Sequence, residues 1–333
     1  MTLWDAMCET MLSTGARRGA MMGTLRCDHP DIEAFVDAKR QGGRLTHFNL
    51  SVQITDAFMA AVRADAAWIL RFPGAPERVV AARGLWDRIL RAAYDCAEPG
   101  VLFIDRINRA NPLRYCERIS ATNPCGEVPL PPYGACDLGS LNLTRYVSAP
   151  FTAEARLDLE ALAGAVPTAV RLLDNVIDAS RFPLPPQADA EKRTRRIGLG
   201  ITGLADAPVM LNLPYGEAPS LVLAGEAMQA ICHAAYRASV ALAREKGSFP
   251  CFERDRYIAG ELARCLPADI RDAIARDGLR NSHLIVVAGR YDQPPGRQSL
   301  ERRRADLRSR VFAPRDHPRR RAGKFLADRL CPA

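Results

Sequence analysis

The residues best suited to chemistry lie in residues 121–143, ATNPCGEVPLPPYGACDLGSLNL. Asn123, Cys125 and Glu127 place an amide, a thiol and a carboxylate at every second position. Alternate residues of an extended segment point to the same side. The spacing therefore predicts that these three groups face one small substrate, with Cys136 close by.

Three functional groups of this kind allow a limited range of reactions. A carboxylate can act as a general base toward a hydroxyl group, and an amide can hold and polarise neighbouring hydroxyls. A cysteine can be a nucleophile, a metal ligand, a redox thiol or the carrier of a thiyl radical. No histidine lies near Cys125 in the sequence, although the fold could supply one, as in a cysteine protease. A single cysteine here would be read as a buried structural residue, but the three groups together indicate catalysis.

The prolines and the glycine of this stretch limit how its backbone can run. Pro124 and Gly126 fit an irregular loop better than a paired central strand. Pro129, Pro131 and Pro132 exclude a helix directly after it. The sequence therefore predicts that the functional groups lie on a loop.

The elements that must position this loop can be predicted from periodicity. Residues 101–104, VLFI, form a short apolar strand that ends in polar residues, as α/β enzymes place beside their sites. Residues 157–177 have helical periodicity, and Pro167 predicts a kink or a break there. Thr55 can cap a helix. The other predicted elements are the end of a helix over residues 1–12, helices over residues 31–39, 86–94 and 220–246, the last closed by Gly247, a strand over residues 48–54, and a glycine-rich strand and turn over residues 196–204.

Composition limits the class of protein. The chain has 333 residues, 48% hydrophobic and 25% charged, as in a soluble globular protein of one large domain or two. No apolar run reaches the length of a membrane span and the N-terminus lacks the pattern of a signal peptide, so we predict a cytoplasmic protein with no membrane partner. Ten cysteines without regular spacing and five scattered histidines support neither a disulfide scaffold nor a metal site.

The net charge of +8 comes from one end of the chain. Residues 286–333 hold 13 Lys and Arg against 5 Asp and Glu, whereas the preceding 285 residues hold 33 of each sign. Arginine clusters neutralise nucleic-acid phosphates, but only this tail would suit such a partner. We therefore predict a neutral domain with a basic tail, and no nucleic-acid partner.

These motifs resemble a known family. NPCGE followed by GACDLGSLNL is similar to the adenosylcobalamin-dependent (class II) ribonucleotide reductases, and the class I enzymes carry a related Asn-x-Cys-x-Glu, usually without this proline and glycine. The resemblance extends over roughly residues 1 to 288 and includes STGARRGAMMGTLRCDHPDIEAF, HFNLSVQITDAF, VLFIDRIN, RRIGLGITGLAD and GLRNSHLI in the family's order. It implies an α/β fold: part of the family's ten-stranded α/β barrel with a central finger loop, the barrel being incomplete.

The resemblance implies a radical reduction of ribonucleoside di- or triphosphates to 2′-deoxyribonucleotides, with adenosylcobalamin, the vitamin B12 coenzyme, as cofactor. In the family the cobalt–carbon bond breaks homolytically and leaves a thiyl radical on the finger-loop cysteine, here Cys125, which removes the ribose 3′-hydrogen. Glu127 would accept the 3′-hydroxyl proton, Asn123 would hold the hydroxyl-bearing face, and water would leave from C2′. The implied substrate-binding residues are Asn123, Pro124, Cys125, Gly126 and Glu127.

The resemblance also assigns a redox thiol. Cys136 would be one half of the dithiol that reduces the intermediate and becomes a disulfide, which a thioredoxin-type reductant would restore. Its partner in the family lies in a preceding segment, and an N-terminal truncation is therefore expected here. Cys8 and Cys27 lie in the wrong segments to replace that partner. Cys331 is alone, so the family's C-terminal shuttle pair is not expected either.

A second loop carries paired arginines. Residues 15–23 contain Arg17 and Arg18 between glycines, and paired arginines on a flexible loop suit phosphate or base contacts. Taken alone, the loop would be a solvated turn. The loop resembles the specificity loop of the family. This resemblance implies that the effector-loop residues are Arg17, Arg18, Gly19 and Ala20. It also implies a nucleoside triphosphate as the allosteric effector.

Residues 289–333 have no helical or strand periodicity, which is typical of a disordered basic extension. After SHLI the family continues roughly A-P-x-G-T-I-S-L-L-A-G-N. If arginines are CGN codons, residues 288–308 in a shifted frame allow about twenty consecutive family residues. We infer a frameshift near Ala288 that replaces a segment resembling the substrate-phosphate loop. The predicted domains are a partial reductase barrel over residues 1–288 and a non-native tail over residues 289–333.

Three functional hypotheses remain open on these grounds. The first is a catalytic-domain fragment of a reductase, inactive when isolated. The second is a nonenzymatic nucleotide-binding remnant, or one half of a split reductase. The third is a nucleic-acid-binding protein, which the neutral charge of residues 1–285 argues against. The choice of di- or triphosphate substrate and the formation of a homodimer are also left open by the sequence.

Overall fold

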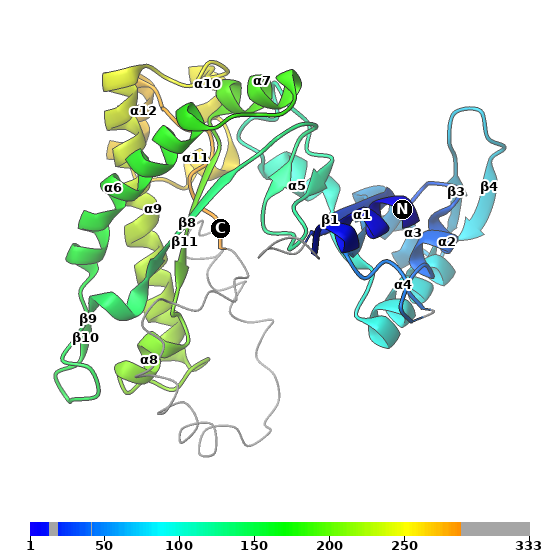
Figure 1. Ribbon diagram of the computed structural model, residues 1–333, viewed down its shortest axis with the longest axis horizontal. Coiled ribbons are helices and arrows are strands. Elements are labelled where there is room, and N and C mark those ends of the chain that lie inside the picture. Colours follow the sequence, from blue (N-terminus) through cyan, green and yellow to red (C-terminus); the bar gives the residue numbers. More distant parts are fainter. Residues whose placement is uncertain (13–18, 41, 288–333) are drawn as a thin grey trace. The chain divides into compact units, whose positions relative to one another are not determined.

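The computed structural model describes residues 1–12, 19–40 and 42–287. The chain divides into two units, with the boundary between Gly134 and Ala135. Each unit contains parallel strands with helices packed against them (Figure 1). The α/β class predicted from the sequence is therefore confirmed for the described residues.

A three-stranded parallel sheet is the centre of unit 1. Its strands are β1 (Met21–Arg26), β2 (Phe48–Ile54) and β5 (Gly100–Phe103), in the order β1-β2-β5. Gly23 pairs with Leu50, and Val52 pairs with Val101. Because the strands are parallel, their carboxyl ends lie at one edge of the sheet.

Helices pack on this sheet through an apolar core. The helices of unit 1 are α1 (Thr2–Leu12), α2 (Ile32–Val36), α3 (Asp56–Arg63), α4 (Ala82–Cys96) and α5 (Ile104–Ala110). Val52 and Ile54 of β2 share one buried cluster with Phe58 of α3 and Ile89 of α4. Burying each such side chain stabilises the fold by about 1.5–3 kcal/mol. The Thr55 side chain accepts a hydrogen bond from Phe58 N at 3.1 Å, which is the cap predicted from the sequence.

Two antiparallel hairpins complete unit 1. β3 (Ala67–Leu70) pairs with β4 (Arg78–Ala81), and β6 (Ala121–Thr122) pairs with β7 (Pro129–Leu130). The second hairpin carries residues 123–128 at its turn. The candidate catalytic loop is therefore held by strands at both of its ends.

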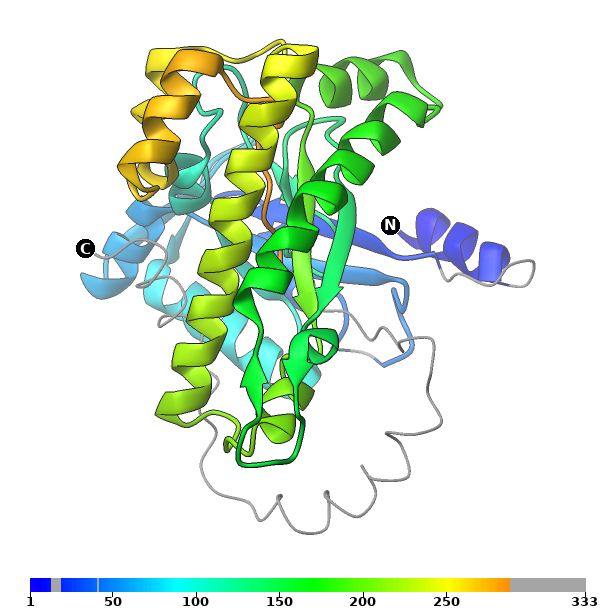
Figure 2. The same ribbon diagram turned by 90° about the vertical axis from the view of Figure 1, so that its left-hand side faces the viewer.

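Unit 2 is built around two parallel strands and two long helices. β8 (Asp137–Asn142) pairs with β11 (Ile197–Thr202), and α6 (Leu159–Ala179) lies beside α9 (Ala218–Lys246) and contacts both strands (Figure 2). α9 ends at Gly247, as predicted. The remaining elements are η1 (Leu143–Tyr146), β9 (Val147–Ser148), β10 (Arg156–Leu157), α7 (Pro185–Thr194), α8 (Asp206–Met210), α10 (Arg254–Ile258), α11 (Glu261–Arg264) and α12 (Ala268–Asp277).

The glycines of β11 allow the segment after Leu284 to approach it closely. A Cβ on Gly200 would lie 2.2 Å from the carbonyl oxygen of Val286, and one on Gly198 would lie 2.5 Å from Val286 Cγ1. Val286 N donates to the carbonyl of Leu199 at 3.2 Å. Packing against this segment therefore requires both glycines of the IGLGIT strand.

A buried network of charges joins several elements of unit 2. Asp174 of α6 is fully buried. Its Oδ1 accepts hydrogen bonds from Arg195 Nε at 3.0 Å, Arg280 Nε at 3.3 Å and Asn281 Nδ2 at 3.0 Å. Lys246 Nζ lies 3.3 Å from Oδ2. Asp174 thus ties α6 to the residue after α7, to the end of α9 and to the GLRNSHLI motif.

The helix predicted over residues 31–39 is shorter in the structure, where α2 ends at Val36. The residues after it form turns, with Ala38 N bonded to Phe35 O and Arg40 N bonded to Asp37 O. Hydrogen bonds between residues three apart close such turns without continuing the α-helix.

Two further predictions are corrected by packing and pairing. The loop predicted over residues 15–23 overlaps β1, because Met21 and Met22 pair with Phe48 and Asn49 and so satisfy their backbone groups in the sheet. Pro167 does not break α6, which is assigned as one helix with a buried apolar face. That packing offsets the hydrogen bond that proline cannot donate.

The described strands form one three-stranded sheet and four two-stranded sheets, and they close no barrel. The described residues therefore agree with an incomplete α/β barrel, and the ten strands and the central position of the finger loop stay predictions. Within the same residues, no helix is long and apolar enough to cross a membrane.

Candidate active site

The candidate loop is closed by its own backbone and by one side chain. β6 pairs with β7 through Ala121 and Leu130. Asn123 N donates to Val128 O at 3.2 Å, and Val128 N donates to Asn123 Oδ1 at 2.9 Å. The Asn123 carboxamide therefore serves as part of the loop's framework.

A tight turn lies inside this closure. Gly126 N donates to Asn123 O at 3.0 Å, and Gly126 has φ +86°. Asparagine at the first position, proline at the second and glycine at the fourth are favoured in type I turns, and the positive φ suits glycine. The alternation predicted for an extended segment is therefore wrong, because residues 123–126 form a turn. Asn123, Cys125 and Glu127 nevertheless lie within one six-residue loop.

Cys125 occupies the third position of this turn. Its side chain is exposed and its thiol is free. A Cβ placed on the neighbouring Gly126 would meet no atom within 4 Å. The tip of the loop therefore leaves space for another molecule to reach the thiol.

Glu127 and Asn123 retain unused hydrogen-bonding capacity. Glu127 Oε2 is buried and has no hydrogen-bond partner among the described residues. Asn123 uses its Oδ1 on Val128 N, while no described residue bonds to its Nδ2. A carboxylate oxygen can accept a proton and an amide nitrogen can donate a hydrogen bond, so the loop offers one acceptor and one donor near a thiol.

Strands β1 and β2 hold the root of the loop. Gln53 Nε2 of β2 donates to Ser120 O at 2.5 Å and to Thr24 Oγ1 of β1 at 3.0 Å. Asn49 Nδ2 of β2 donates to the carbonyl of Pro124. The parallel sheet therefore positions the loop through Asn49 and Gln53, neither of which was predicted as a site residue.

The other predicted site residues are placed as follows. Cys136 is half-buried in unit 2, directly before β8, and its Sγ lies 3.6 Å from Asp137 O. Cys125 belongs to unit 1, so the proximity of the two thiols stays a prediction. Arg17 and Arg18 lie outside the described residues. Gly19 is half-buried, and a Cβ on it would lie 3.0 Å from Cys8 Cβ, while Ala20 is exposed.

A buried acid near Cys136 was missed by the sequence reading. Glu191 of α7 is 2% exposed, and both of its carboxylate oxygens are buried. Burial raises the pKa of Glu191 to about 8, against the opposing effect of Arg196 and with a further rise from the charge of Asp137. Burial also raises the pKa of Asp137. Nothing in the periodicity of residues 185–194 distinguishes this glutamate from a solvated one.

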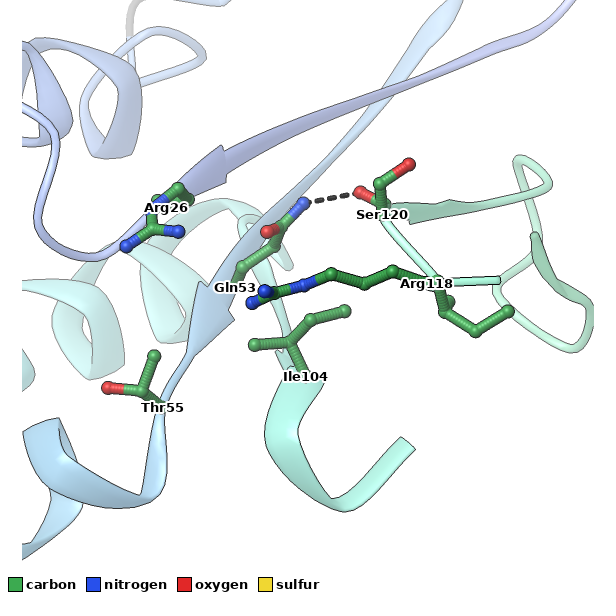
Figure 3. A pocket seen from close by; sticks show the side chains of 7 residues that line it. Arg26, Gln53, Thr55, Ile104, Arg118 and Ser120 are labelled. Carbon is green, nitrogen blue, oxygen red and sulfur yellow. Dashed lines mark hydrogen bonds between the residues drawn. The ribbon is translucent and has the colours of Figure 1, made fainter. Parts of the chain in front are cut away.

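A pocket at the root of the loop was also missed. Two arginines distant in sequence, Arg26 and Arg118, line it together with Gln53 and Ser120 (Figure 3). The pairing of β1 with β2 places Arg26 opposite Gln53, and the hydrogen bond from Gln53 to Ser120 O joins the segment of Arg118 to them. Elsewhere in the described ranges, no group of three or more His, Cys, Asp or Glu could hold a metal ion.

An α/β domain that presents a free thiol, a carboxylate and an amide on one short loop has the features of an enzyme. Comparison with known proteins gives the family. Residues 1–289 match the model of the ribonucleotide reductase barrel domain, and the chain belongs to the ribonucleotide reductase family.

Several curated relatives cover most of the chain. It is 44% identical over 260 residues to a vitamin B12-dependent ribonucleoside-diphosphate reductase of Mycobacterium tuberculosis (strain CDC 1551 / Oshkosh), covering 77% of this chain and 37% of the relative. It is 39% identical over 255 residues to a protein of the same name from Thermoplasma acidophilum, covering 76% and 33%. A ribonucleoside-diphosphate reductase large subunit of vaccinia virus is 28% identical over 308 residues, covering 81% and 40%. The chain thus spans about a third of the length of the first two relatives.

Proposed function

We propose that this chain carries the radical site of an adenosylcobalamin-dependent ribonucleotide reductase. The reaction would be reduction of a ribonucleotide at C2′ to the 2′-deoxyribonucleotide. The names of the relatives favour a diphosphate substrate. The observation that carries the proposal is the loop itself, where an exposed free thiol and an unpaired carboxylate oxygen lie two residues apart.

Each group of the loop has a role that its surroundings support. Cys125 is exposed, so its sulfur can reach a ribose C3′ and remove that hydrogen as a thiyl radical. Glu127 Oε2 has no competing hydrogen bond, so it can accept the proton of the 3′-hydroxyl as water leaves C2′. Asn123 Nδ2 can donate to a ribose hydroxyl while its Oδ1 stays on Val128 N.

The loop tip fits a bulky cofactor that must reach the thiol from outside. Cys125 is exposed, and the space beside Gly126 is open among the described residues. Cys125 and Gly126 would therefore face the group. Adenosylcobalamin, when bound, supplies the carbon radical that takes the hydrogen atom from a thiol.

The finer features of the family are part of the same proposal. The strands of both units would belong to a ten-stranded barrel with residues 123–128 as its finger loop. Cys136 would supply one of two electron-donating thiols, with a thioredoxin-type reductant restoring it. A nucleoside triphosphate would act as effector through the loop that contains Arg17 and Arg18, and a homodimer is the assembly we propose.

An assay of the isolated chain tests whether these residues suffice for turnover. The chain, adenosylcobalamin, dithiothreitol and a labelled ribonucleotide are mixed, and the deoxyribonucleotide is measured, with Cys125→Ala as control. We expect no turnover, because catalysis needs the substrate held in a near-attack geometry and the phosphate loop is predicted to be lost near Ala288. Turnover that depends on Cys125 would overturn the prediction that the isolated chain is inactive.

A second candidate function is one half of a split reductase. It is favoured by the described strands, which close no barrel. Adding separately produced segments of a relative that precede and follow the matched region should then restore turnover that Cys125→Ala abolishes. Binding of nucleotides without turnover in that mixture would favour the nonenzymatic alternative.

A further inference from the structure

The pocket at the root of the loop lies at the carboxyl ends of all three strands of the unit 1 sheet. Arg26 is the last residue of β1, Gln53 and Thr55 flank the end of β2, and Ile104 follows β5 directly. The cavity has a volume of about 210 Å³. Ligands of open α/β sheets bind at the carboxyl ends of the strands, so its position is that of a binding site.

Two guanidinium groups reach this pocket from different segments. Arg118 extends from the segment before Ile119, past Ile104 toward Gln53, and Arg26 approaches from the end of β1 (Figure 3). Arg118 has no hydrogen bond or ion pair with any described residue. Its planar fork of donors is therefore available to a ligand.

Two acidic groups whose charges act on Arg26 are already engaged. Asp28 accepts two hydrogen bonds from Arg26, Nε–Oδ1 at 2.8 Å and Nη2–Oδ2 at 2.6 Å, which lower the pKa of Asp28. Asp105 Oδ2 accepts a hydrogen bond from Asp56 N at 2.8 Å. Arg118 is thus left as the positive charge that no acid of the described residues neutralises.

We propose that this pocket binds a phosphate-type oxyanion, with Arg118 as its main ligand. An arginine fork matches the oxygens of a phosphate in a bidentate manner. The volume is below the roughly 300–1,000 Å³ of pockets for drug-sized ligands, so the site holds a phosphate or diphosphate group and not a whole nucleoside. Arg26 uses its Nε and Nη2 on Asp28, so its Nη1 supplies a further donor.

This anion site is separate from the proposed reductase chemistry, but it adjoins the root of the candidate loop. Ser120 lies directly before β6, and its carbonyl accepts the hydrogen bond from Gln53 that fixes the loop root. An anion bound by Arg118 and Arg26 therefore adds a tie between the end of β1 and the segment that leads into Asn123. Anion binding is measured without turnover, so the proposed anion site and the proposed reductase function can be contradicted independently.

The test is anion binding to the full chain and to three variants. Inorganic pyrophosphate and cytidine diphosphate are titrated separately at constant ionic strength, with binding followed by calorimetry and by phosphorus NMR. Arg118→Gln removes the fork, Arg118→Lys keeps the charge without the fork, and Arg114→Gln is the matched control. Arg114 is exposed on the same segment and does not line the pocket.

We expect Arg118→Gln to weaken binding at least about tenfold, the factor for one lost charge-assisted hydrogen bond. The anion affinity of Arg118→Lys should lie between those of Arg118→Gln and the parent chain, and the affinity of Arg114→Gln should match that of the parent chain. Pyrophosphate binding that depends on Arg118 supports the site and shows that a free anion suffices. Binding of cytidine diphosphate alone, with the same dependence, supports a nucleotide as the source of the phosphate. No binding of either probe, or equal effects of Arg118→Gln and Arg114→Gln, would overturn the proposal.

Discussion

Asn123 shows how one residue of the loop can serve both folding and chemistry. Its Oδ1 accepts the Val128 N hydrogen bond that closes the loop, and its Nδ2 is left for a ligand. Substitutions of Asn123 can separate the role of its Oδ1 from the role of its Nδ2. Aspartate keeps an acceptor and loses the donor, whereas alanine loses both.

We predict that Asn123→Ala lowers the free energy of unfolding by about 1 kcal/mol, the value of one hydrogen bond with its partner left unsatisfied. Asn123→Asp should change it by less than about 0.5 kcal/mol, because the carboxylate still accepts from Val128 N. Urea denaturation of the two variants measures both values. Equal losses for alanine and aspartate would show that the Oδ1 contact does not stabilise the loop.

Glu191 makes the stability of the chain depend on pH. Burial raises the pKa of Glu191 from its ordinary value of 4.5 to about 8 in the folded state. Below pH 4.5 the carboxyl is protonated in both states, and its contribution to stability is fully present. Between pH 4.5 and 8 only the unfolded state gives up the proton, so that contribution is lost as the pH rises.

We therefore expect Glu191→Gln to remove this loss. The variant and the parent should unfold at similar temperatures near pH 4.5, and at pH 8 the variant should be more stable by on the order of 4 kcal/mol. Melting curves across this range measure the difference, with the exposed Glu226→Gln of α9 as control. A constant difference between Glu191→Gln and the parent at all pH values would contradict the raised pKa.

At the scale of elements, Asp174 of α6 connects its helix to the end of α9 and to the GLRNSHLI motif in unit 2. It contacts Arg195, Lys246 and Arg280 while being fully buried. Removing one partner of a buried ion pair leaves uncompensated charge in the interior. The GLRNSHLI motif is explained in part by this contact, since Asn281 also bonds to Asp174.

Asp174→Ala should destabilise the chain by about 3–5 kcal/mol. The matched control is Asp189→Ala, which removes an exposed i,i+4 pair with Arg193 and should cost less than about 1 kcal/mol. Chemical denaturation monitored by circular dichroism gives both values. If the two variants lose the same amount, the network around Asp174 does not hold these elements together.

Some elements could be predicted from the sequence because their signals are local. Phe48–Ile54 alternates, Thr55 caps α3, and Gly247 ends α9. β8 was not predicted, because the two-residue alternation of apolar side chains is weak in DLGSLN. Pro167 was given too much weight, because propensity does not include the tertiary packing of α6.

The features of the candidate site also differ in whether they have a local signal in the sequence. The residue types of the Asn123–Glu127 loop and its irregular backbone could be predicted, since Pro124 and Gly126 occupy fixed positions of one turn. The partner of the Asn123 Oδ1, the buried state of Glu191 and the pocket of Arg118 could not. Each of these depends on contacts made by the fold, which no spacing in the sequence reports.

At the scale of the whole molecule, the proposed reaction needs groups from both units. Cys125 belongs to unit 1 and Cys136 to unit 2. The chain spans 37% of its Mycobacterium tuberculosis relative, which supplies a full-length context in which the loop can be tested. In that context the activity of the loop no longer depends on whether the isolated chain can bind substrate.

The most direct test is a chimera in which residues 1–287 replace the matching segment of that relative. Labelled cytidine diphosphate, adenosylcobalamin and dithiothreitol are supplied, and deoxycytidine diphosphate is measured. We predict turnover by the chimera and by its Cys96→Ser variant, whose substitution lies at the end of α4, and none by Cys125→Ser. Turnover by Cys125→Ser equal to that of Cys96→Ser, or a folded chimera that forms no product, would contradict the central claim.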